Sequence, residues 1–219
     1  CNLGAKKVIH IGTWFWGKKY PQYYLERLKS SIARNLRDPY QFHIWEPEGQ
    51  DLSLTKIPGC FARLRAFDPE WQQARGIKPH EDRVVVIDLD LVVTGSLDRL
   101  FDRDEPFTIL QGVNATNPCP YNGSIWSLRA GTHSEVVSEF SLEKAGLAPW
   151  FAFPDDQAWF HHMIPNAGAF GVKDGIYAFK KPGWPSGSNL PKGARMVAFP
   201  GFRDPSQFTT LNWVKEHWR

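Results

Sequence analysis

Residues 83–101 read RVVVIDLDLVVTGSLDRLF and carry the strongest structural signal in the chain. The segment from Val84 to Ile87 is wholly apolar, and Asp88 and Asp90 follow it with one residue between them. A carboxylate within a buried strand costs free energy unless a cation or hydrogen bonds compensate it. The pattern therefore predicts a buried strand over 84–87 that ends at an opening in the protein, with both carboxylates at its rim.

Before this strand the chain has the pattern of a crossover unit. A short apolar segment at 8–11 and an alternating segment at 41–45 predict two more strands. Between them, apolar side chains recur at four-residue spacing from Tyr24 to Leu36, and Pro21 stands where a first helical turn tolerates proline. The order strand, helix, strand predicts that the two strands are parallel.

Alternation of strands and helices continues to the end of the chain. Further elements are expected as strands at 107–110 and 124–128, helices at 59–67 and 210–218, and an ordered Pro- and Gly-rich loop at 180–205. Thr132 and Glu135 have the spacing of a capping box, and Asp155 suits the N-cap of another helix. The chain is therefore predicted to be one α/β domain over 1–219, with a mainly parallel central sheet flanked by helices.

Composition excludes several classes of protein. The 219 residues have a net charge of +3 without a long run of Lys and Arg, so no nucleic-acid partner is expected. No apolar run reaches about 18 residues, so no integral membrane segment is expected. Three widely spaced cysteines fit neither a disulfide framework nor a zinc ribbon. A reducing, cytoplasmic location follows as an expectation.

The two aspartates suggest a ligand site rather than an ordinary strand end. Ligands of open α/β sheets bind at the carboxyl ends of strands, and residues two apart in a strand face the same side. Two such carboxylates suit a hard divalent cation, Mg²⁺ or Mn²⁺, which offsets the charge of a diphosphate. The simplest alternative is structural, with Asp90 capping a turn and Asp88 held by hydrogen bonds.

A second alternative is a phosphatase. The run from Asp88 to Val92 is similar to the D-x-D-x-[TV] motif of haloacid-dehalogenase-like phosphatases, which also follows an apolar strand. That resemblance implies Asp88 as the nucleophile and Asp90 as the acid/base. In that family the motif usually opens the domain, whereas here 87 residues precede Asp88.

A longer run favours a third hypothesis. Residues 84–101, with the turn Gly95-Ser96-Leu97, resemble the signature of GT-A-fold glycosyltransferases, particularly family 8 and its uncharacterised bacterial relatives. Other motifs of these relatives are matched in order at 16–20 (WGKKY), 59–67 (GCFARLRAF), 121–124 (YNGS), 156–157 (DQ) and 197–205 (VAFPGFRDP). Because the matches cover most of the chain, a glycosyltransferase is the favoured hypothesis.

The resemblance implies roles for particular residues. It divides the chain into a nucleotide-binding half, about 1–101, and an acceptor-binding half, about 102–219. The implied nucleotide-sugar contacts are Gly12, Thr13, Lys18, Arg63, Asp88 and Leu89, the implied ligands of Mn²⁺ or Mg²⁺ are Asp88 and Asp90, and the implied catalytic residues are Asp156, Gln157 and Asn122. Among the catalytic residues, Asp156 would grip the sugar, Gln157 would lie beneath the anomeric carbon, and Asn122 would orient sugar hydroxyls.

The implied activity is transfer of a hexosyl group from a nucleoside-diphosphate sugar, expected to be a UDP-sugar, to an acceptor hydroxyl with retention of configuration. The expected acceptor is a glycan, a protein or a small molecule. In the closing motif the relatives carry a His as third metal ligand, where this chain has Pro200. Because proline offers no side-chain ligand, a nucleotide-sugar-binding protein without turnover is a further alternative.

Overall fold

A computed structural model of the chain describes residues 8–55, 59–114, 117–148 and 154–219. The strands are β1 (Ile9–Trp14), β2 (Tyr40–Trp45), β3 (Arg83–Ile87), β4 (Val92–Val93), β5 (Phe107–Gln111), β6 (Tyr121–Arg129), β7 (Gly168–Phe170), β8 (Ile176–Ala178) and β9 (Met196–Ala198). The α-helices are α1 (Gln22–Asn35), α2 (Pro69–Gln73), α3 (Glu135–Ser138), α4 (Leu142–Leu147), α5 (Asp156–Met163) and α6 (Asn212–His217). The 3-10 helices are η1 (Gly49–Thr55), η2 (Gly59–Phe67), η3 (Val172–Asp174) and η4 (Pro205–Phe208).

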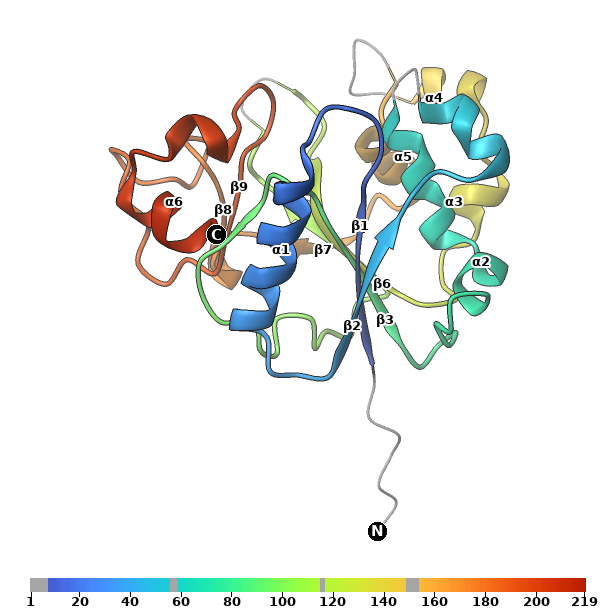
Figure 1. The fold of residues 1–219 in the computed structure, drawn as a ribbon. Helices are drawn as coiled ribbons and strands as arrows, with labels where there is room; N and C mark the ends of the chain where they lie inside the picture. Colours follow the sequence, from blue (N-terminus) through green and yellow to red (C-terminus); the bar gives the residue numbers. More distant parts are fainter. Residues whose placement is uncertain (1–7, 56–58, 115–116, 149–153) are drawn as a thin grey trace.

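Six strands form the central sheet in the order β2-β1-β3-β6-β5-β7 (Figure 1). β1 pairs in parallel with β2 and β3, and β5 pairs in parallel with β7. β6 runs antiparallel between β3 and β5. The predicted α/β fold with a mostly parallel central sheet and flanking helices is therefore confirmed, with β6 as the reversed strand.

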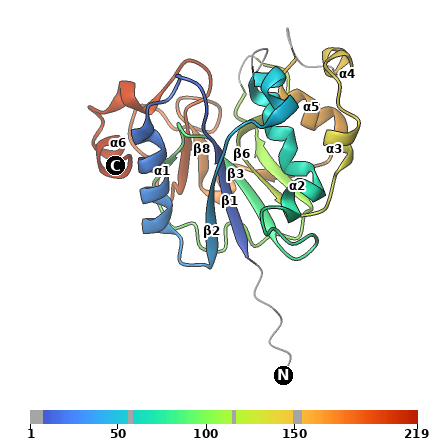
Figure 2. The same ribbon diagram turned by 45° about the vertical axis from the view of Figure 1, so that its right-hand side comes forward.

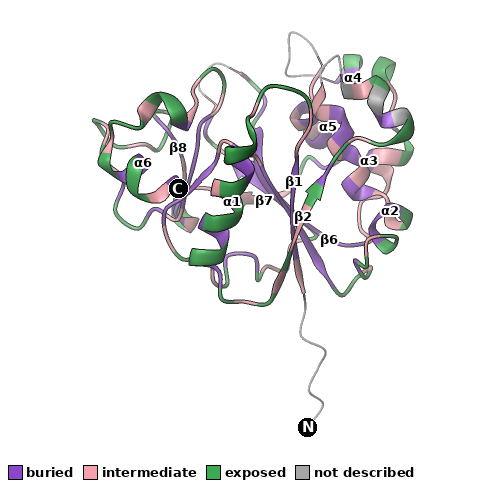
Figure 3. Cartoon of the chain, viewed as in Figure 1, coloured by how far each residue is buried: buried purple, intermediate pink, exposed green. Residues whose placement is uncertain are grey.

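The apolar run in β3 reflects burial on both faces of the sheet. All five residues of the strand are buried. Val85 and Ile87 belong to the core beneath α1, whereas Val84 and Val86 belong to the core beneath η2, α2, α3 and α5. Figure 2 shows the sheet between these two layers, and Figure 3 shows its strands as mostly buried. A strand covered on both sides has no polar face, so its sequence cannot alternate.

The first crossover unit matches its prediction. α1 buries Tyr24, Leu25, Leu28 and Ile32 against the sheet, which is the stripe that the four-residue spacing predicted. The strands on either side of it are parallel, as expected. Within the described part of the chain, no helix combines the length and the apolar character needed to cross a bilayer.

A second sheet, β4-β9-β8, was not predicted. β9 lies inside the segment 180–205 that was expected to be loop, and it pairs antiparallel with β4 and parallel with β8. These strands have two or three residues each, too short for any period to be read from the sequence. Phe179, Phe199 and Trp213 pack together behind this sheet and support the segment that follows β9.

The expected capping box at Thr132 is wrong. α3 begins at Glu135 after Ser134 and has no side-chain cap bond. The Thr132 hydroxyl instead donates to the carbonyl oxygen of Arg129, because the chain is still turning away from β6 at that point. A motif of two residues cannot distinguish a helix start from such a turn.

Two other local predictions have opposite outcomes. β1 continues to Trp14 instead of stopping before Gly12, because its pairing with β2 extends to Trp45. The N-cap prediction is confirmed, since the Asp155 carboxylate accepts a hydrogen bond of 2.9 Å from the Ala158 amide at the start of α5.

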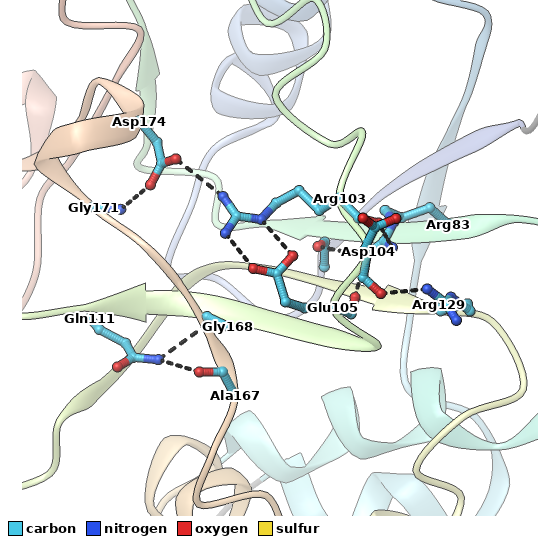
Figure 4. Close-up of polar contacts among 11 residues, drawn as sticks. Arg83, Arg103, Asp104, Glu105, Gln111, Arg129, Ala167, Gly168, Gly171 and Asp174 are labelled. Carbon is cyan, nitrogen blue, oxygen red and sulfur yellow. Dashed lines mark hydrogen bonds and ion pairs between the residues drawn. The ribbon is translucent and has the colours of Figure 1, made fainter.

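At the amino end of β3, charged side chains form a network that we call the distal cluster, made of Arg83, Arg103, Glu105 and Asp174 (Figure 4). Arg103 pairs with Glu105 at 2.8 Å and with Asp174 at 3.1 Å. The buried Arg83 donates to the carbonyl oxygens of Arg103 and Glu105 and to the Ser127 hydroxyl. The distal cluster ties the segment before β5 to η3 and β3.

Candidate functional site

A cavity of about 520 Å³ opens at the carboxyl ends of β1 and β3, where ligands of α/β sheets bind. Its wall includes the loop after β1 and the segment after β9, which both lie in the upper part of the view in Figure 1. The lining comes from 14, 16–20, 59–60, 63, 88–90, 122–124, 157 and 199–201. Both halves of the chain therefore contribute to one cavity.

Asp88 and Asp90 line this cavity directly after β3. Asp88 Oδ1 lies 2.6 Å from Arg63 Nη1, and Asp90 Oδ2 accepts a hydrogen bond of 2.6 Å from the Tyr20 hydroxyl. Burial raises the pKa of the Asp88 carboxyl, and burial together with the charge of Asp88 raises the pKa of Asp90 to about 7. Leu89 separates them and also lines the cavity. Carboxylates perturbed by burial and by each other in a cleft are typical of functional sites.

Arg63 on η2 bridges two carboxylates that are far apart in the chain. Its guanidinium lies 2.6 Å from Asp88 and 2.5 Å from Asp156, and it donates to the Gly123 carbonyl oxygen at 3.1 Å. Burial alone lowers the pKa of Arg63, but the charges of Asp156 and Asp88 outweigh it and raise that pKa. We call Arg63, Asp88, Asp90 and Asp156 the cleft cluster. It sets three carboxyl groups against one guanidinium.

The first turn of α5 brings Gln157 to the cavity and holds Asp156 behind Arg63, outside the lining. Asp156 is buried beneath Arg63, whereas Gln157 lines the cavity and accepts a hydrogen bond of 3.3 Å from the Gly123 amide. Burial and the charge of Asp156 raise the pKa of the capping Asp155 to about 6. A Cβ atom at Gly123 would lie 2.6 Å from Arg63 Nη2. Glycine at this position is therefore required for the observed placement of the guanidinium.

Asn122 and Lys18 line the cavity from β6 and from the loop after β1, respectively. Asn122, in β6, donates to Asn114 Oδ1 at 3.4 Å and accepts a hydrogen bond of 3.1 Å from the Ser124 amide, which orients its amide group. Lys18 is exposed on the loop after β1. The structure thus brings most of the predicted site residues to this cavity, namely Lys18, Arg63, Asp88, Leu89, Asp90, Asn122 and Gln157.

Gly12 and Thr13 are placed differently, inside β1 and buried below the cavity lining. A Cβ atom at Gly12 would lie 2.0 Å from the Trp45 ring. The glycine therefore leaves room for an aromatic side chain of the core, which is a sufficient structural reason for it. Contact of Gly12 and Thr13 with a nucleotide stays a prediction.

Tyr20 and Trp16 are site residues to which the sequence analysis assigned no role. Burial and the neighbouring Asp90 raise the pKa of Tyr20, so its hydroxyl remains a hydrogen-bond donor to that carboxylate. Trp16 lies against Gly59, where a Cβ atom would be 3.3 Å from its ring. The family resemblance drew attention to the loop 16–20, but no local pattern could pair Tyr20 with a partner 70 residues away.

The carboxylate oxygens of Asp88 and Asp90 are of the type that binds a hard divalent cation when a bound phosphate supplies further ligands. Among the described residues, no three His, Cys, Asp or Glu side chains converge as a metal-binding group, and Pro200 on the cavity wall adds no side-chain ligand. Asp88 and Asp90 each have a second carboxylate oxygen besides the one bonded to Arg63 or Tyr20. Mg²⁺ is commonly held by one or two carboxylates together with substrate phosphates and waters, so the two residues fit such an ion.

Comparisons of the fold point to one class of proteins. No protein-family model matches the chain, and no curated protein matches it by sequence. Solved structures of glycosyltransferases do match, and because their identities to this chain are low, the likeness shows the fold alone. The protein has the GT-A-like α/β fold of glycosyltransferases, as the sequence motifs predicted; membership of family 8 stays a prediction.

Three of these structures show the extent of the likeness. The apo-form glycosyltransferase GlyE of Streptococcus pneumoniae TIGR4 has a TM-score of 0.59 at 11% identity, covering 97% of this chain and 63% of GlyE. The galactosyltransferase LgtC, in complex with donor and acceptor sugar analogs, has a TM-score of 0.55 at 12% identity, covering 97% of this chain and 96% of LgtC. The bifunctional glycosyltransferase WbbM has a TM-score of 0.59 at 15% identity, covering 99% of this chain and 52% of WbbM. The chain thus spans less than two thirds of two of these proteins.

Proposed function

We propose that the protein is a glycosyltransferase that moves a hexosyl group from a nucleoside-diphosphate sugar, a UDP-sugar in the first instance, to an acceptor hydroxyl. The observation that carries this proposal is the cleft cluster. Asp88 and Asp90 end a buried strand inside a cavity, next to a guanidinium, in a fold shared with glycosyltransferases. The cysteine usage supports a cytoplasmic location for this activity.

The cavity supplies opposite charges for a diphosphate donor. Asp88 and Asp90 would hold Mn²⁺ or Mg²⁺, which when bound offsets the negative charge of the diphosphate. Arg63 and Lys18 line the same cavity and add positive charge on the protein side. Arg63 is fixed by Asp88 and Asp156, so little reorganisation is needed when phosphate charge develops. The nucleotide would occupy the half of the cavity formed by about 1–101.

The second half of the chain would handle the sugar. Asn122 would orient donor hydroxyls from the cavity wall, Asp156 would act on the sugar through the Arg63 guanidinium that covers it, and Gln157 would be a weak partner near the anomeric carbon. In the proposed reaction the bond from the anomeric carbon to the diphosphate oxygen breaks and a bond to the acceptor oxygen forms. The acceptor proton passes to the leaving diphosphate. Gln157 is a poor nucleophile, so retention would proceed without a covalent enzyme intermediate.

One observation favours a second candidate, a nucleotide-sugar-binding protein without turnover. The position of the expected third metal ligand is Pro200, and the described residues offer no replacement that converges with Asp88 and Asp90. Such a protein would bind the donor through Arg63 and Lys18 and would not need Mn²⁺. The phosphatase alternative has no comparable support, because the fold is shared with glycosyltransferases.

A thermal-shift screen of UDP- and GDP-sugars with and without Mn²⁺, followed by a hydrolysis and transfer assay, tests the proposal. A ligand at 100 times its dissociation constant stabilises a protein by about 2.7 kcal/mol, which is readily measured. We expect a Mn²⁺-dependent shift with a UDP-sugar and release of UDP. Binding without any reaction would select the second candidate, and release of phosphate from small phosphoesters, lost in Asp88→Asn, would select the phosphatase. The absence of both binding and reaction with every donor tested would reject the proposed function.

A further inference from the structure

We propose that Asp82, His10 and His43 form a site that binds one proton, and that this proton reverses the hydrogen bonding of His43. Through Trp45 and Trp14 the site would link pH to nucleotide binding, a link that rests on the proposed function. We call Asp82, His10 and His43 the histidine relay. Within the described residues, the relay lies outside the cavity lining, and the proposed reaction does not use it.

Asp82 fixes the position of the hydrogen on His10. The buried Asp82 carboxylate accepts hydrogen bonds from the backbone amides of Val8 at 3.2 Å and Lys78 at 2.8 Å. His10 in β1 is 1% exposed, and its Nε2 lies 3.1 Å from Asp82 Oδ2, the oxygen that the Lys78 amide also bonds. Because both carboxylate oxygens already accept from amides, the hydrogen of this contact belongs to His10 Nε2.

The second ring nitrogen of His10 fixes the position of the hydrogen on His43. His10 Nδ1 lies 2.9 Å from His43 Nε2, a contact that needs one hydrogen between two ring nitrogens. In neutral His10 the only ring N–H is at Nε2, so Nδ1 accepts and His43 Nε2 must donate. The Nδ1 atom of a neutral His43 then carries no hydrogen and is an acceptor.

One added proton reverses this arrangement. When His10 carries a hydrogen on both nitrogens, its Nδ1 donates and His43 Nε2 must accept. The hydrogen of His43 then lies on Nδ1, which changes from an acceptor to a donor. A proton that arrives at Nδ1 of the half-buried His43 produces this state without moving a ring, because Nε2 passes its own hydrogen across the 2.9 Å contact to His10. The charge then rests on the buried His10 beside Asp82.

A second proton does not fit the relay. Two charged rings would set one N–H against another across the contact between His10 and His43. Burial, the charge of His10 and the charge of Arg75 together lower the pKa of His43 to about 4. The relay is therefore expected to bind a single proton between about pH 5 and 8, the range in which histidines commonly change charge.

The other charged groups that pack near the relay form pairs of their own. Arg75, which follows α2, lies 2.6 Å from Glu48. On the loop before β3, Lys78 and Glu81 are exposed and lie 3.7 Å apart. Asp82 at one end of the relay and Arg75 near the other therefore favour a positive charge on His10 over one on His43.

Aromatic contacts connect the relay to the cavity. The rings of His43 and Trp45 are stacked at 5.6 Å, and those of Trp45 and Trp14 lie 4.7 Å apart. Trp14 lines the cavity. A positive charge in the relay favours an anion in the cavity, so protonation should tighten the binding of a nucleoside diphosphate. By linkage, the bound nucleotide should favour the protonated relay to the same extent.

The first test observes the relay in the parent protein. NMR of the protein labelled with ¹⁵N-histidine distinguishes ring nitrogens with and without a hydrogen, and His10→Gln and His43→Gln assign the signals. We expect the hydrogen of His43 on Nε2 at pH 9 and on Nδ1 at pH 5, where His10 carries a hydrogen on both nitrogens. A His43 that keeps one tautomer throughout, or two rings that both become charged above pH 5, would overturn the proposal.

The second test measures UDP binding by calorimetry at pH 6 and pH 8 with Mg²⁺. His10→Gln keeps an N–H donor for Asp82 but cannot take up the proton. His133→Gln is the matched control, because His133 also pairs with a carboxylate, Glu135 at 3.0 Å, and lies outside the cavity lining. The ratio of UDP affinities at pH 6 and pH 8 should be about fivefold larger in the parent and in His133→Gln than in His10→Gln, at the low end of usual coupling between sites.

A third measurement covers the case in which His10→Gln does not fold. Saturating UDP should raise the midpoint of the relay titration in the parent by about 0.7 pH units, the same fivefold coupling measured from the other side. Equal affinity ratios in the three proteins, or an unshifted midpoint, would overturn the link to the cavity. Absence of UDP binding at both pH values would instead reject the proposed function, and the tautomers of His43 would still decide the relay.

Discussion

The cleft cluster and the distal cluster lie at opposite ends of the same strand and use the same residue types, but their electrostatics differ. In the cleft cluster, burial dominates, and the carboxyl groups of Asp88 and Asp90 have raised pKa values. In the distal cluster, hydrogen bonds from Arg103 dominate and lower the pKa of Glu105. One end of β3 therefore holds carboxylates that are costly to ionise, and the other end holds a carboxylate that ionises easily.

The difference follows from how the charges are compensated. The distal arginines pair with carboxylates and donate to backbone carbonyl oxygens, although the buried Nε of Arg83 has no hydrogen-bond partner among the described residues. The cleft cluster has one guanidinium for three carboxyl groups, and it faces a cavity. Carboxyl groups that face a cavity whose wall also carries Lys18 and Lys19 can exchange partners with a charged ligand, whereas the distal network is held among side chains and backbone. Substitutions in the cleft cluster should therefore change turnover, whereas substitutions in the distal cluster should change stability.

The largest effect is expected for Asp88→Asn. Loss of this charge should lower turnover of the nucleotide sugar by about 10²–10³, the usual cost of removing one preorganised electrostatic partner. Steady-state assays with a UDP-sugar and Mn²⁺ measure it. Asp174→Asn in the distal cluster is the matched control and should leave turnover per folded molecule unchanged. Equal losses in both variants would abolish the distinction between the clusters.

Arg83→Met should act on stability alone. Burial and the nearby Arg129 lower the pKa of Arg83, so its charge is not itself favourable. Removal of the guanidinium, however, leaves the carbonyl oxygens of Arg103 and Glu105 without this donor. This loss should lower the free energy of unfolding by about 1–3 kcal/mol. Denaturant unfolding measures the loss. A variant of normal stability but low turnover would show that the distal cluster is coupled to the cavity.

Gly123→Ala is expected to disturb the cleft cluster without changing a charge. The added Cβ would lie 2.6 Å from Arg63 Nη2, so the guanidinium must move away from Asp156. Turnover should fall about tenfold, equivalent to about 1.4 kcal/mol. Gly146→Ala is the control, since a Cβ there has no neighbour within 4 Å. Unchanged kinetics in Gly123→Ala would show that the position of Arg63 does not matter.

The smallest effect is a gain of stability in Asp90→Asn. The pKa of Asp90 is raised to about 7 from 3.8 in the unfolded chain, so the folded protein favours the protonated form. Its stabilising contribution is complete below about pH 4 and is lost as the pH rises through 7. At pH 8 without metal, Asp90→Asn should be more stable by about 1 kcal/mol, and the pH dependence of Tm should flatten. A lower Tm of the variant at pH 8 would contradict the conclusion that the ionised Asp90 carboxylate destabilises the folded protein.

The fold was largely predictable because its signals are local. The apolar run before Asp88 predicts a strand buried on both faces, and the spacing of Tyr24, Leu28 and Ile32 predicts the helix that covers one face. The second sheet was missed for the opposite reason. β4 and β9 are short strands more than 100 residues apart, and only their pairing makes them strands. Thr132 shows the same limit, since a two-residue motif has no meaning without the path of the chain around it.

By itself, the sequence determined the central strand, the order of strands and helices, and the pair of aspartates that ends β3, because burial periodicity and D-x-D spacing act over a few residues. Only the tertiary structure decided that Arg63 joins Asp88 to Asp156, that Tyr20 holds Asp90, and that Gly12 serves the core instead of the cavity lining. Those pairings connect segments 25 to 93 residues apart. Their energies depend on distance and burial in space, which no local pattern contains.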